Sequence, residues 1–272
     1  AALGDLDRAV DGPPGAFGVL LELGYRHVAA GAAVGAAALG AATGVLYREG
    51  PPLAGAASPM VVAALLEPDP VDGVPPVVRA VQRAGGGDGS RAGRAWLERY
   101  LHLSLRPLTR LLVCHGVGLE AHAQNSLVAL DDGWPARFVV RDLEGASLNR
   151  DHPRAGGRFG GVITADSPAL YGEGEVWRRF AYYLLVNHLG QLIAALAEHL
   201  GAAEAELWSI AAGVLADEAV RHGADPAAAP LRHLLDGATL PAKANLVSVF
   251  GGHGENPTWV SIPNPLRSNT TR

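Results

Sequence analysis

Apolar residues recur at three- and four-residue intervals in several parts of the chain and predict helices. One such stretch is Ala92–Val113, in which Pro107 is expected to bend the helix. Glu175–Leu200 repeats the same periodicity. Glycines in cap positions end two further predicted helices, Ala203–Arg221 and Pro226–Leu235.

Shorter runs of apolar and β-branched residues predict strands. Met60–Leu66 has the length of one buried strand. Ser126–Leu130 and Arg137–Arg141 are joined by Asp131–Pro135, whose turn-forming residues predict a β-hairpin. Two last strands are expected at Asn245–Phe250 and Trp259–Ile262. Together these elements predict an α+β fold, in which a helical mass packs around a small, mostly antiparallel sheet that contains the hairpin.

Proline and glycine interrupt the first part of the chain and predict loops there. We therefore expect residues 1–90 to be a connecting segment and residues 91–272 to be the main domain. The chain begins with Ala1 rather than Met and shows no signal-peptide pattern, which predicts a fragment of a longer protein. The uncharged run Val28–Tyr47 is mostly alanine and glycine, so we expect a close-packed helix or loop and not a membrane span.

The overall composition narrows the classes of function. The net charge of −5 and the pI near 6.1 argue against a nucleic-acid-binding surface. Cys114 is the single cysteine, which excludes an internal disulfide, a four-cysteine metal site and an iron–sulfur cluster. A single cysteine also fits a cytoplasmic protein. A local basic patch for a small anion remains compatible with the net charge.

Polar residues gather just before the predicted hairpin. Glu120, His122 and Gln124 alternate with two alanines, so in an extended backbone their side chains share one face. Asn125 belongs to the opposite face, and it joins the others only if the chain turns there.

The register of the hairpin brings a second polar pair to the same end. A hairpin centred on Gly133 places Gln124 opposite Asp142 and Asn125 opposite Arg141. The resulting carboxylate and amide oxygens suit Mg²⁺, which shares oxygen ligands with phosphate groups. The imidazole before the hairpin and the guanidinium after it can neutralise phosphates or a substrate carboxylate.

Two other interpretations of this cluster remain open. A polar cluster at a strand end can be a solvated loop without chemistry. His115, Glu120 and His122 could bind zinc, although their spacing matches no common zinc pattern.

The run His115-Gly-x-x-Leu-Glu-x-His-x-Gln-Asn-x-Leu, followed after the hairpin by Arg-Asp-x-x-Gly, resembles the signature of the NRPS-independent siderophore synthetases, the IucA/IucC family. Shorter motifs support the resemblance from about residue 45 to residue 266. They are Tyr47-Arg48-Glu49, Glu67-Pro68-Asp69-Pro70, the helix motif Tyr182 to Leu189, Leu240-Pro-Ala-Lys243-Ala and Pro263-Asn264-Pro265-Leu266.

The resemblance implies a chemistry and a role for each matched residue. Members of the family adenylate citrate, succinate or a related acid with ATP and Mg²⁺, and an amine or hydroxyl group, in some cases of a hydroxamate, then displaces AMP. By position, the resemblance implies that Mg²⁺ and the ATP phosphates are bound by Glu120, Gln124, Asn125 and Asp142. It implies a catalytic role for His122, Arg141 and Arg48, of which Arg48 also binds an anionic group. Substrate contacts are implied for His122, Tyr182 and Lys243. Residues 91–272 would then be a palm-like catalytic domain and residues 1–90 the end of a nucleotide-binding "fingers" region. A homodimer is also compatible with the family.

The chain departs from the family pattern in ways that keep other functions open. The Arg-Thr and Lys-Leu motifs of the family's N-terminal half are absent, and Asn245, Val247 and Val249 stand where further arginines are usual. A ferric reductase is not expected, because one cysteine holds no iron–sulfur cluster. The alternatives are a kinase of the aminoglycoside-phosphotransferase type, although Val117 occupies the place of its catalytic aspartate, and a non-catalytic binding module.

Overall fold

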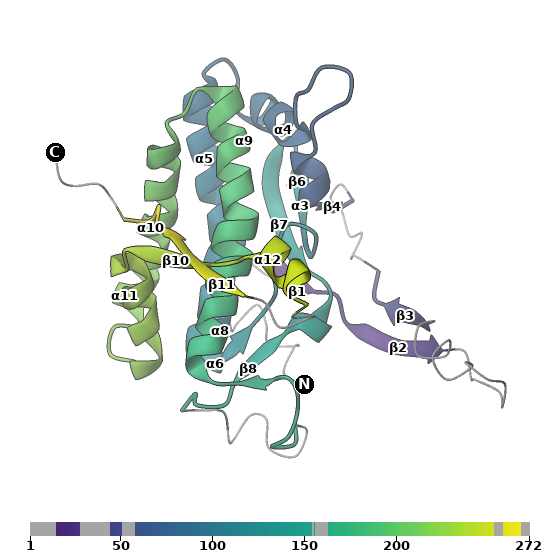
Figure 1. The fold of residues 1–272 in the computed structure, drawn as a ribbon. Coiled ribbons are helices and arrows are strands. Elements are labelled where there is room, and N and C mark those ends of the chain that lie inside the picture. The colour runs from purple at the N-terminus through teal and green to yellow at the C-terminus, as the bar shows by residue number, and fades with distance from the viewer. Residues whose placement is uncertain are drawn as a thin grey trace.

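A four-stranded sheet and the helices packed against it form the body of the protein (Figure 1). The computed structural model describes residues 15–27, 44–50, 58–153, 155, 163–252 and 258–267. Helices and small sheets occur together, so the predicted mixed class is confirmed. Elements before residue 90 and after it contribute to one hydrophobic core. The predicted division at residue 90 stays a prediction.

The hairpin lies at the centre of this sheet. Strand β6 (Ser126–Asp131) pairs antiparallel with β7 (Trp134–Val140). The short strands β4 (Met60–Val61) and β1 (Phe17–Val19) join its two sides, and only the pairing of β1 with β7 is parallel. The predicted mostly antiparallel sheet is therefore confirmed.

The turn of the hairpin depends on Gly133. Its φ of 85° follows a φ of 44° at Asp132, as expected for a two-residue turn between twisted strands. A Cβ atom at Gly133 would lie 2.4 Å from the carbonyl oxygen of Ala80, so a side chain does not fit. The indole of Trp96 donates a hydrogen bond to the carbonyl of Gly133 over 2.8 Å, which ties the turn to the core.

The register of the hairpin agrees with the prediction. Ser126 pairs with Val140, and the amide of Arg141 donates to the carbonyl of Asn125 over 2.9 Å. A bulge between Ala129 and Leu130 shifts the register only near the turn. The open end of the hairpin therefore brings the residues before β6 next to those after β7.

Helices pack against the face of the sheet that is turned towards the core. The bounds of the longer ones are α4 (Pro76–Gly85), α5 (Gly89–Leu103), α6 (Leu105–His115), α8 (Glu173–Phe180), α9 (Gly190–Leu200), α10 (Glu204–Arg221) and α11 (Ala229–Asp236). A π-helical segment, Ala181–Leu189, joins α8 to α9. Trp96 of α5 stacks on Tyr100, whose ring meets the edge or face of Phe138 of β7, and all three side chains are fully buried. The core thus lies between α5, the α8–α9 helix and the hairpin.

Smaller elements complete the described chain. They are the ribbon of β2 (Glu22–His27) with β3 (Gly44–Arg48), the sheet of β5 (Val117–Gly118), β8 (Ser147–Asn149) and β9 (Leu170–Tyr171), the pair of β10 (Thr239–Lys243) and β11 (Trp259–Pro263), the helices α3 (Val62–Leu66) and α12 (Asn245–Phe250), and two 3₁₀ turns, Leu143–Gly145 and Pro226–Ala228. Figure 1 shows β2 and β3 as an arm that projects from the body.

Two of the expected elements differ in part from the structure, and a third is confirmed. The helix predicted at 92–113 is interrupted at Ser104, and Pro107 lies in the first turn of α6, where proline removes no helical hydrogen bond. The run Met60–Leu66 is a strand for two residues only, and its helix-favouring alanines and leucines then form α3. The expected strand Trp259–Ile262 is confirmed as part of β11.

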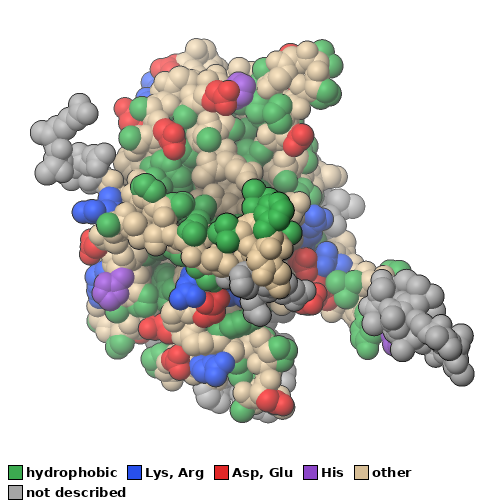
Figure 2. Space-filling view, in the orientation of Figure 1, with side chains coloured by type: hydrophobic (Ala, Val, Ile, Leu, Met, Phe, Trp, Pro, Cys, Tyr) green, Lys and Arg blue, Asp and Glu red, His purple; other side chains and the backbone are tan. Residues whose placement is uncertain are grey.

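The segment Asn245–Phe250 is a helix, α12, and the predicted strand is wrong. Strand β10 ends just before it and takes β11 as its partner, which leaves this segment without a strand to pair with. Its apolar side chains stay on the surface instead, where Figure 2 shows hydrophobic side chains gathered over the place of α12.

One continuous helix, Glu173–Leu200, is long and apolar enough to cross a membrane by length and composition. Inside the protein, 61% of its most apolar window is buried, which is also the pattern of a core helix. In the predicted close-packed helix or loop Val28–Tyr47, residues 28–43 lie outside the described residues, and residues 44–47 belong to strand β3 instead.

Candidate functional site

The segment before the hairpin presents its polar side chains as the alternation predicted. Ala121 and Ala123 are buried, Glu120 and His122 are partly exposed, and Gln124 is exposed. The expected turn is also present, because the amides of Asn125 and Ser126 both donate to the carbonyl of His122.

A buried histidine fixes the backbone of this segment through a hydrogen bond. His188 lies in the π-helical segment, and its Nδ1 is 2.7 Å from the carbonyl oxygen of Ala121. The carbonyl can only accept, so Nδ1 carries the proton, and Nε2 accepts from the hydroxyl of Tyr100 over 2.6 Å. Burial lowers the pKa of His188 to about 4, which keeps the ring neutral at neutral pH.

The residues after the hairpin meet the same segment. The guanidinium of Arg141 donates two hydrogen bonds to the carbonyl of Gln124, over 2.9 and 3.2 Å. Asp142 has a left-handed backbone with φ of 66°, a conformation that aspartate and asparagine tolerate better than most residues. Gln124 and Asp142 therefore lie at one end of the hairpin, as predicted.

Arg48, at the base of the β2–β3 ribbon, reaches this end of the hairpin. Its guanidinium donates to the carboxylate of Glu22 over 2.8 Å and lies 3.7 Å from that of Asp142. The carboxylate of Glu22 also accepts from the amide of Leu143. No sequence motif indicated Glu22, because its place depends on the pairing of β2 with β3.

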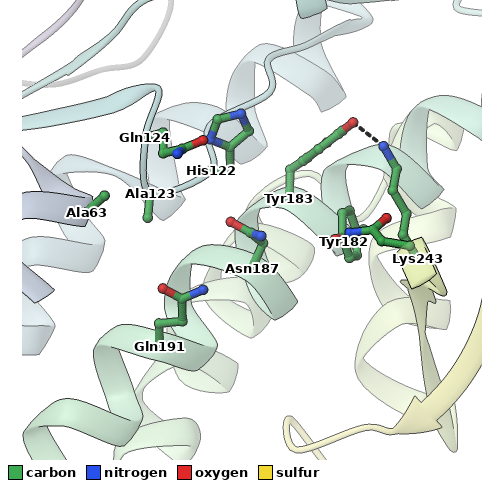
Figure 3. A pocket seen from close by; sticks show the side chains of 10 residues that line it. Ala63, His122, Ala123, Gln124, Tyr182, Tyr183, Asn187, Gln191 and Lys243 are labelled. Atoms are coloured by element: carbon green, nitrogen blue, oxygen red, sulfur yellow. Dashed lines mark hydrogen bonds between the residues drawn. The ribbon is translucent and has the colours of Figure 1, made fainter. Parts of the chain in front are cut away.

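A cavity of about 420 Å³ lies beside the segment (Figure 3). The π-helical segment supplies much of its wall, because i→i+5 hydrogen bonding brings Tyr182 and Asn187 to the same face. The remaining lining residues are Ala63, His122, Ala123, Gln124, Tyr183, Gln191, Lys243 and Asn245. Three predicted substrate contacts, His122, Tyr182 and Lys243, thus line one cavity.

Lys243 is the only lysine in the chain. Its ammonium nitrogen lies 4.4, 5.4 and 5.8 Å from the ring centres of Tyr183, Tyr182 and Trp259, and it donates to the hydroxyl of Tyr183 (Figure 3). Burial is the largest cause that lowers the pKa of Lys243. Apart from the histidines, every other basic side chain is arginine, so a compact side-chain ammonium group occurs only at this position.

The tautomer and protonation state of His122 give it a hydrogen-bond donor for a ligand. The amide of Asn125 donates to its Nδ1 over 3.3 Å, so the neutral ring carries its proton on Nε2. Burial lowers the pKa of His122, while the carboxylates of Glu120 and Asp142 raise it by a smaller amount. The ring is therefore neutral near pH 7 and has one N–H group to donate.

Glu120 is engaged by a residue that the sequence motifs did not single out. Arg179 of α8 lies 2.5 Å from its carboxylate, and the two side chains are 20% and 15% exposed. Arg179 and Tyr183 stand four residues apart on one helix, so helical spacing was the available signal for a shared face.

No group of three histidine, cysteine, aspartate or glutamate side chains that could hold a metal ion occurs within the described ranges. The zinc interpretation of His115, Glu120 and His122 therefore finds no support in the geometry. The polar residues that flank the open end of the hairpin are instead Asp142, Gln124 and the buried Asn125.

Comparisons with known proteins identify the family of the chain. A family model described as "Ferric iron reductase FhuF-like transporter" matches residues 94–258. The L-2,3-diaminopropanoate–citrate ligase of Staphylococcus aureus is 35% identical over 210 residues, which cover 77% of this chain and 35% of that protein. The spermidine-citrate ligase of Bacillus anthracis is 32% identical over 185 residues, 63% of this chain and 29% of that protein. The chain thus spans about a third of the length of these curated relatives.

Solved structures show the same fold. Aerobactin synthetase IucA of Klebsiella pneumoniae matches with a TM-score of 0.68 and 26% identity, over 77% of this chain and 38% of that one. Its ATP-bound form matches with a TM-score of 0.76 and 23% identity, over 97% of this chain and 46% of that one. The chain therefore belongs to the FhuF-like family and is a member of the NRPS-independent siderophore synthetases, the IucA/IucC group that its motifs indicated.

Proposed function

We propose that this site joins a carboxylic acid to an amine or hydroxyl group through an acyl-adenylate made from ATP. The observation that carries the proposal is the meeting of two regions at the open end of the hairpin. The carboxylate of Asp142 and the guanidinium groups of Arg48 and Arg141 lie on one side, and the cavity with His122, Gln124 and Lys243 lies on the other. The fold relationship to an ATP-bound synthetase supports the nucleotide.

The reaction proceeds in two steps. A carboxylate oxygen of the acid attacks the α-phosphorus of ATP, and pyrophosphate leaves. The nucleophile then attacks the acyl carbon, AMP leaves with the electrons of the C–O bond, and the nucleophile loses a proton to water. Both steps concentrate negative charge on phosphate oxygens, so positioned cations and N–H donors lower their barriers.

The described residues fit each requirement. Arg48 and Arg141 neutralise phosphate charge, and the Nε2–H group of His122 donates to the reacting carboxylate or to the α-phosphate. The ammonium of Lys243 binds a further carboxylate of the acid. Two relatives are named as citrate ligases, so we propose citrate or a similar di- or tricarboxylic acid, and an amine as the nucleophile.

Mg²⁺ fits the donor set at the open end of the hairpin. Asp142 would supply one carboxylate oxygen, and Gln124 and Asn125 would supply amide oxygens, which suit this ion together with phosphate oxygens. Bound there, Mg²⁺ would neutralise charge on the phosphates. Because Arg179 already engages the carboxylate of Glu120, we assign Glu120 to contacts with Arg179 and with Tyr183 of the cavity wall, and not to the metal. A homodimer and a cytoplasmic location stay predictions.

The products of the reaction test the proposal. The full-length protein that contains these residues, given ATP, Mg²⁺, citrate and hydroxylamine, is expected to release AMP and pyrophosphate and to form a hydroxamate of the acid. The same assay with succinate in place of citrate shows which of the two acids the site activates. Release of ADP in place of AMP would show a kinase and would overturn the proposal, and an absence of any nucleotide product would favour a binding module.

A further inference from the structure

The carboxylate of Glu120 is held from several sides. The inference drawn from these contacts rests on the proposed function and extends it. On one side Arg179 makes the ion pair described above, with both side chains mostly buried. The guanidinium of Arg179 is itself fixed, because its carbon lies 4.7 Å from the ring centre of Tyr171. Two partly buried charges in fixed positions interact more strongly than an exposed pair.

On another side Gly145 makes room for the same carboxylate. A Cβ atom at position 145 would lie 2.6 Å from the carboxyl carbon of Glu120 and 2.6 Å from one of its oxygens. The backbone of Gly145 is in a short 3₁₀ turn and not in the left-handed region, so its conformation does not require glycine. The space that Glu120 needs is therefore the reason for the glycine of the Arg-Asp-x-x-Gly motif.

The carboxylate also connects to the cavity through Tyr183. Burial is the largest cause that raises the pKa of Tyr183 well above its usual value, and a hydrogen bond with Glu120 adds to it. The tyrosine hydroxyl accepts from the ammonium of Lys243, which leaves its own proton available for Glu120. The guanidinium carbon of Arg179, the partner of Glu120, lies 6.0 Å from the ring centre of Tyr183. Arg179, Glu120, Tyr183 and Lys243 thus form one chain of contacts that ends in the cavity.

We propose that Arg179 and Gly145 are positioning residues that together fix the carboxylate of Glu120, and that this carboxylate holds the Tyr183–Lys243 pair in place for the acid substrate. Gly145 leaves the space for the carboxylate, and Arg179 supplies the charge that keeps it there. Neither residue needs to touch the substrate, because both act through Glu120.

Kinetics of the full-length protein separate this role from a general loss of structure. Arg179→Gln and Gly145→Ala are each expected to lower kcat/KM for the acid by about tenfold or more, with little change in the KM for ATP. In a Glu120→Gln background the same two changes should add less than about twofold, because the group through which they act is already altered. The matched controls are Arg79→Gln, in an exposed ion pair, and Gly213→Ala, where a Cβ atom has open space. Independent, additive losses would overturn the proposal.

A second measurement needs no substrate. Because Lys243 is the only lysine, a ¹³C-lysine label gives one side-chain signal in the 272-residue chain, and that signal reports directly on the cavity. The signal is expected to move in Arg179→Gln and Gly145→Ala but not in the two controls. An unchanged signal in the first two variants would contradict the proposal. A moved signal in a protein that forms no AMP would leave the network standing and remove the proposed function.

Discussion

Asp142→Asn is expected to lower the rate of AMP formation by a factor on the order of 100 or more while the fold stays intact. The substitution removes the one carboxylate charge that we place beside Mg²⁺ and the phosphates. It keeps the size of the side chain, and asparagine tolerates the left-handed φ of 66° at this position. Alanine would add backbone strain there, so asparagine isolates the chemistry.

The hairpin offers a matched control at its other end. Asp132 also has a positive φ, 44°, and lies in the turn. Asp132→Asn therefore makes the same chemical change in the same hairpin, and it should leave the rate within about twofold of the unaltered protein. Initial rates of pyrophosphate release measure both variants. Equal rates in the two variants would remove Asp142 from the site.

The free energy of unfolding is expected to fall by about 2–3 kcal/mol between pH 7 and pH 4.5 because of His188 alone. Burial lowers its pKa in the folded protein from 6.5 to about 4. Between these two values the unfolded chain binds a proton that the folded protein excludes. The stability is therefore fully present above the unfolded pKa and is lost as the pH falls towards the folded pKa.

Denaturant unfolding across this pH range measures the effect. His188→Gln should be less stable at neutral pH, since it disturbs the bonds to Ala121 and Tyr100, and its stability should depend less on pH. His233→Gln, on the exposed face of α11, is the matched control and should keep the full dependence. If His188→Gln kept the same slope as the unaltered protein, the buried neutral histidine would not be its source.

The hairpin and its register could be predicted because the signals are local. Gly133 marks the turn, and from Ala129 to Ser126 the pairs follow the register predicted for a hairpin centred on it; the bulge between Ala129 and Leu130 next to the turn was not predicted. Alternation of polar residues with Ala121 and Ala123 then indicated which side chains face the site. The resemblance added Arg48, and the structure places it within 3.7 Å of Asp142.

The parts that could not be predicted depend on distant partners. Nothing near Arg179 in the sequence indicates that it meets Glu120, which lies 59 residues earlier. The π-helical segment, which shapes the cavity, looks like an ordinary amphipathic helix in sequence. The apolar run of α12 favours a strand by its composition, but β10 already has its partner in β11.

The oxygen atoms of the acid provide the most direct test of the central claim, that this site forms an acyl-adenylate. Citrate labelled with ¹⁸O in its carboxylates is incubated with the full-length protein, ATP, Mg²⁺ and the amine, and the AMP is examined by mass spectrometry. Our account predicts one ¹⁸O atom in each AMP released, because the attacking carboxylate oxygen stays on the α-phosphorus when the acyl carbon is attacked. Label in inorganic phosphate together with ADP, or AMP without label, would contradict it.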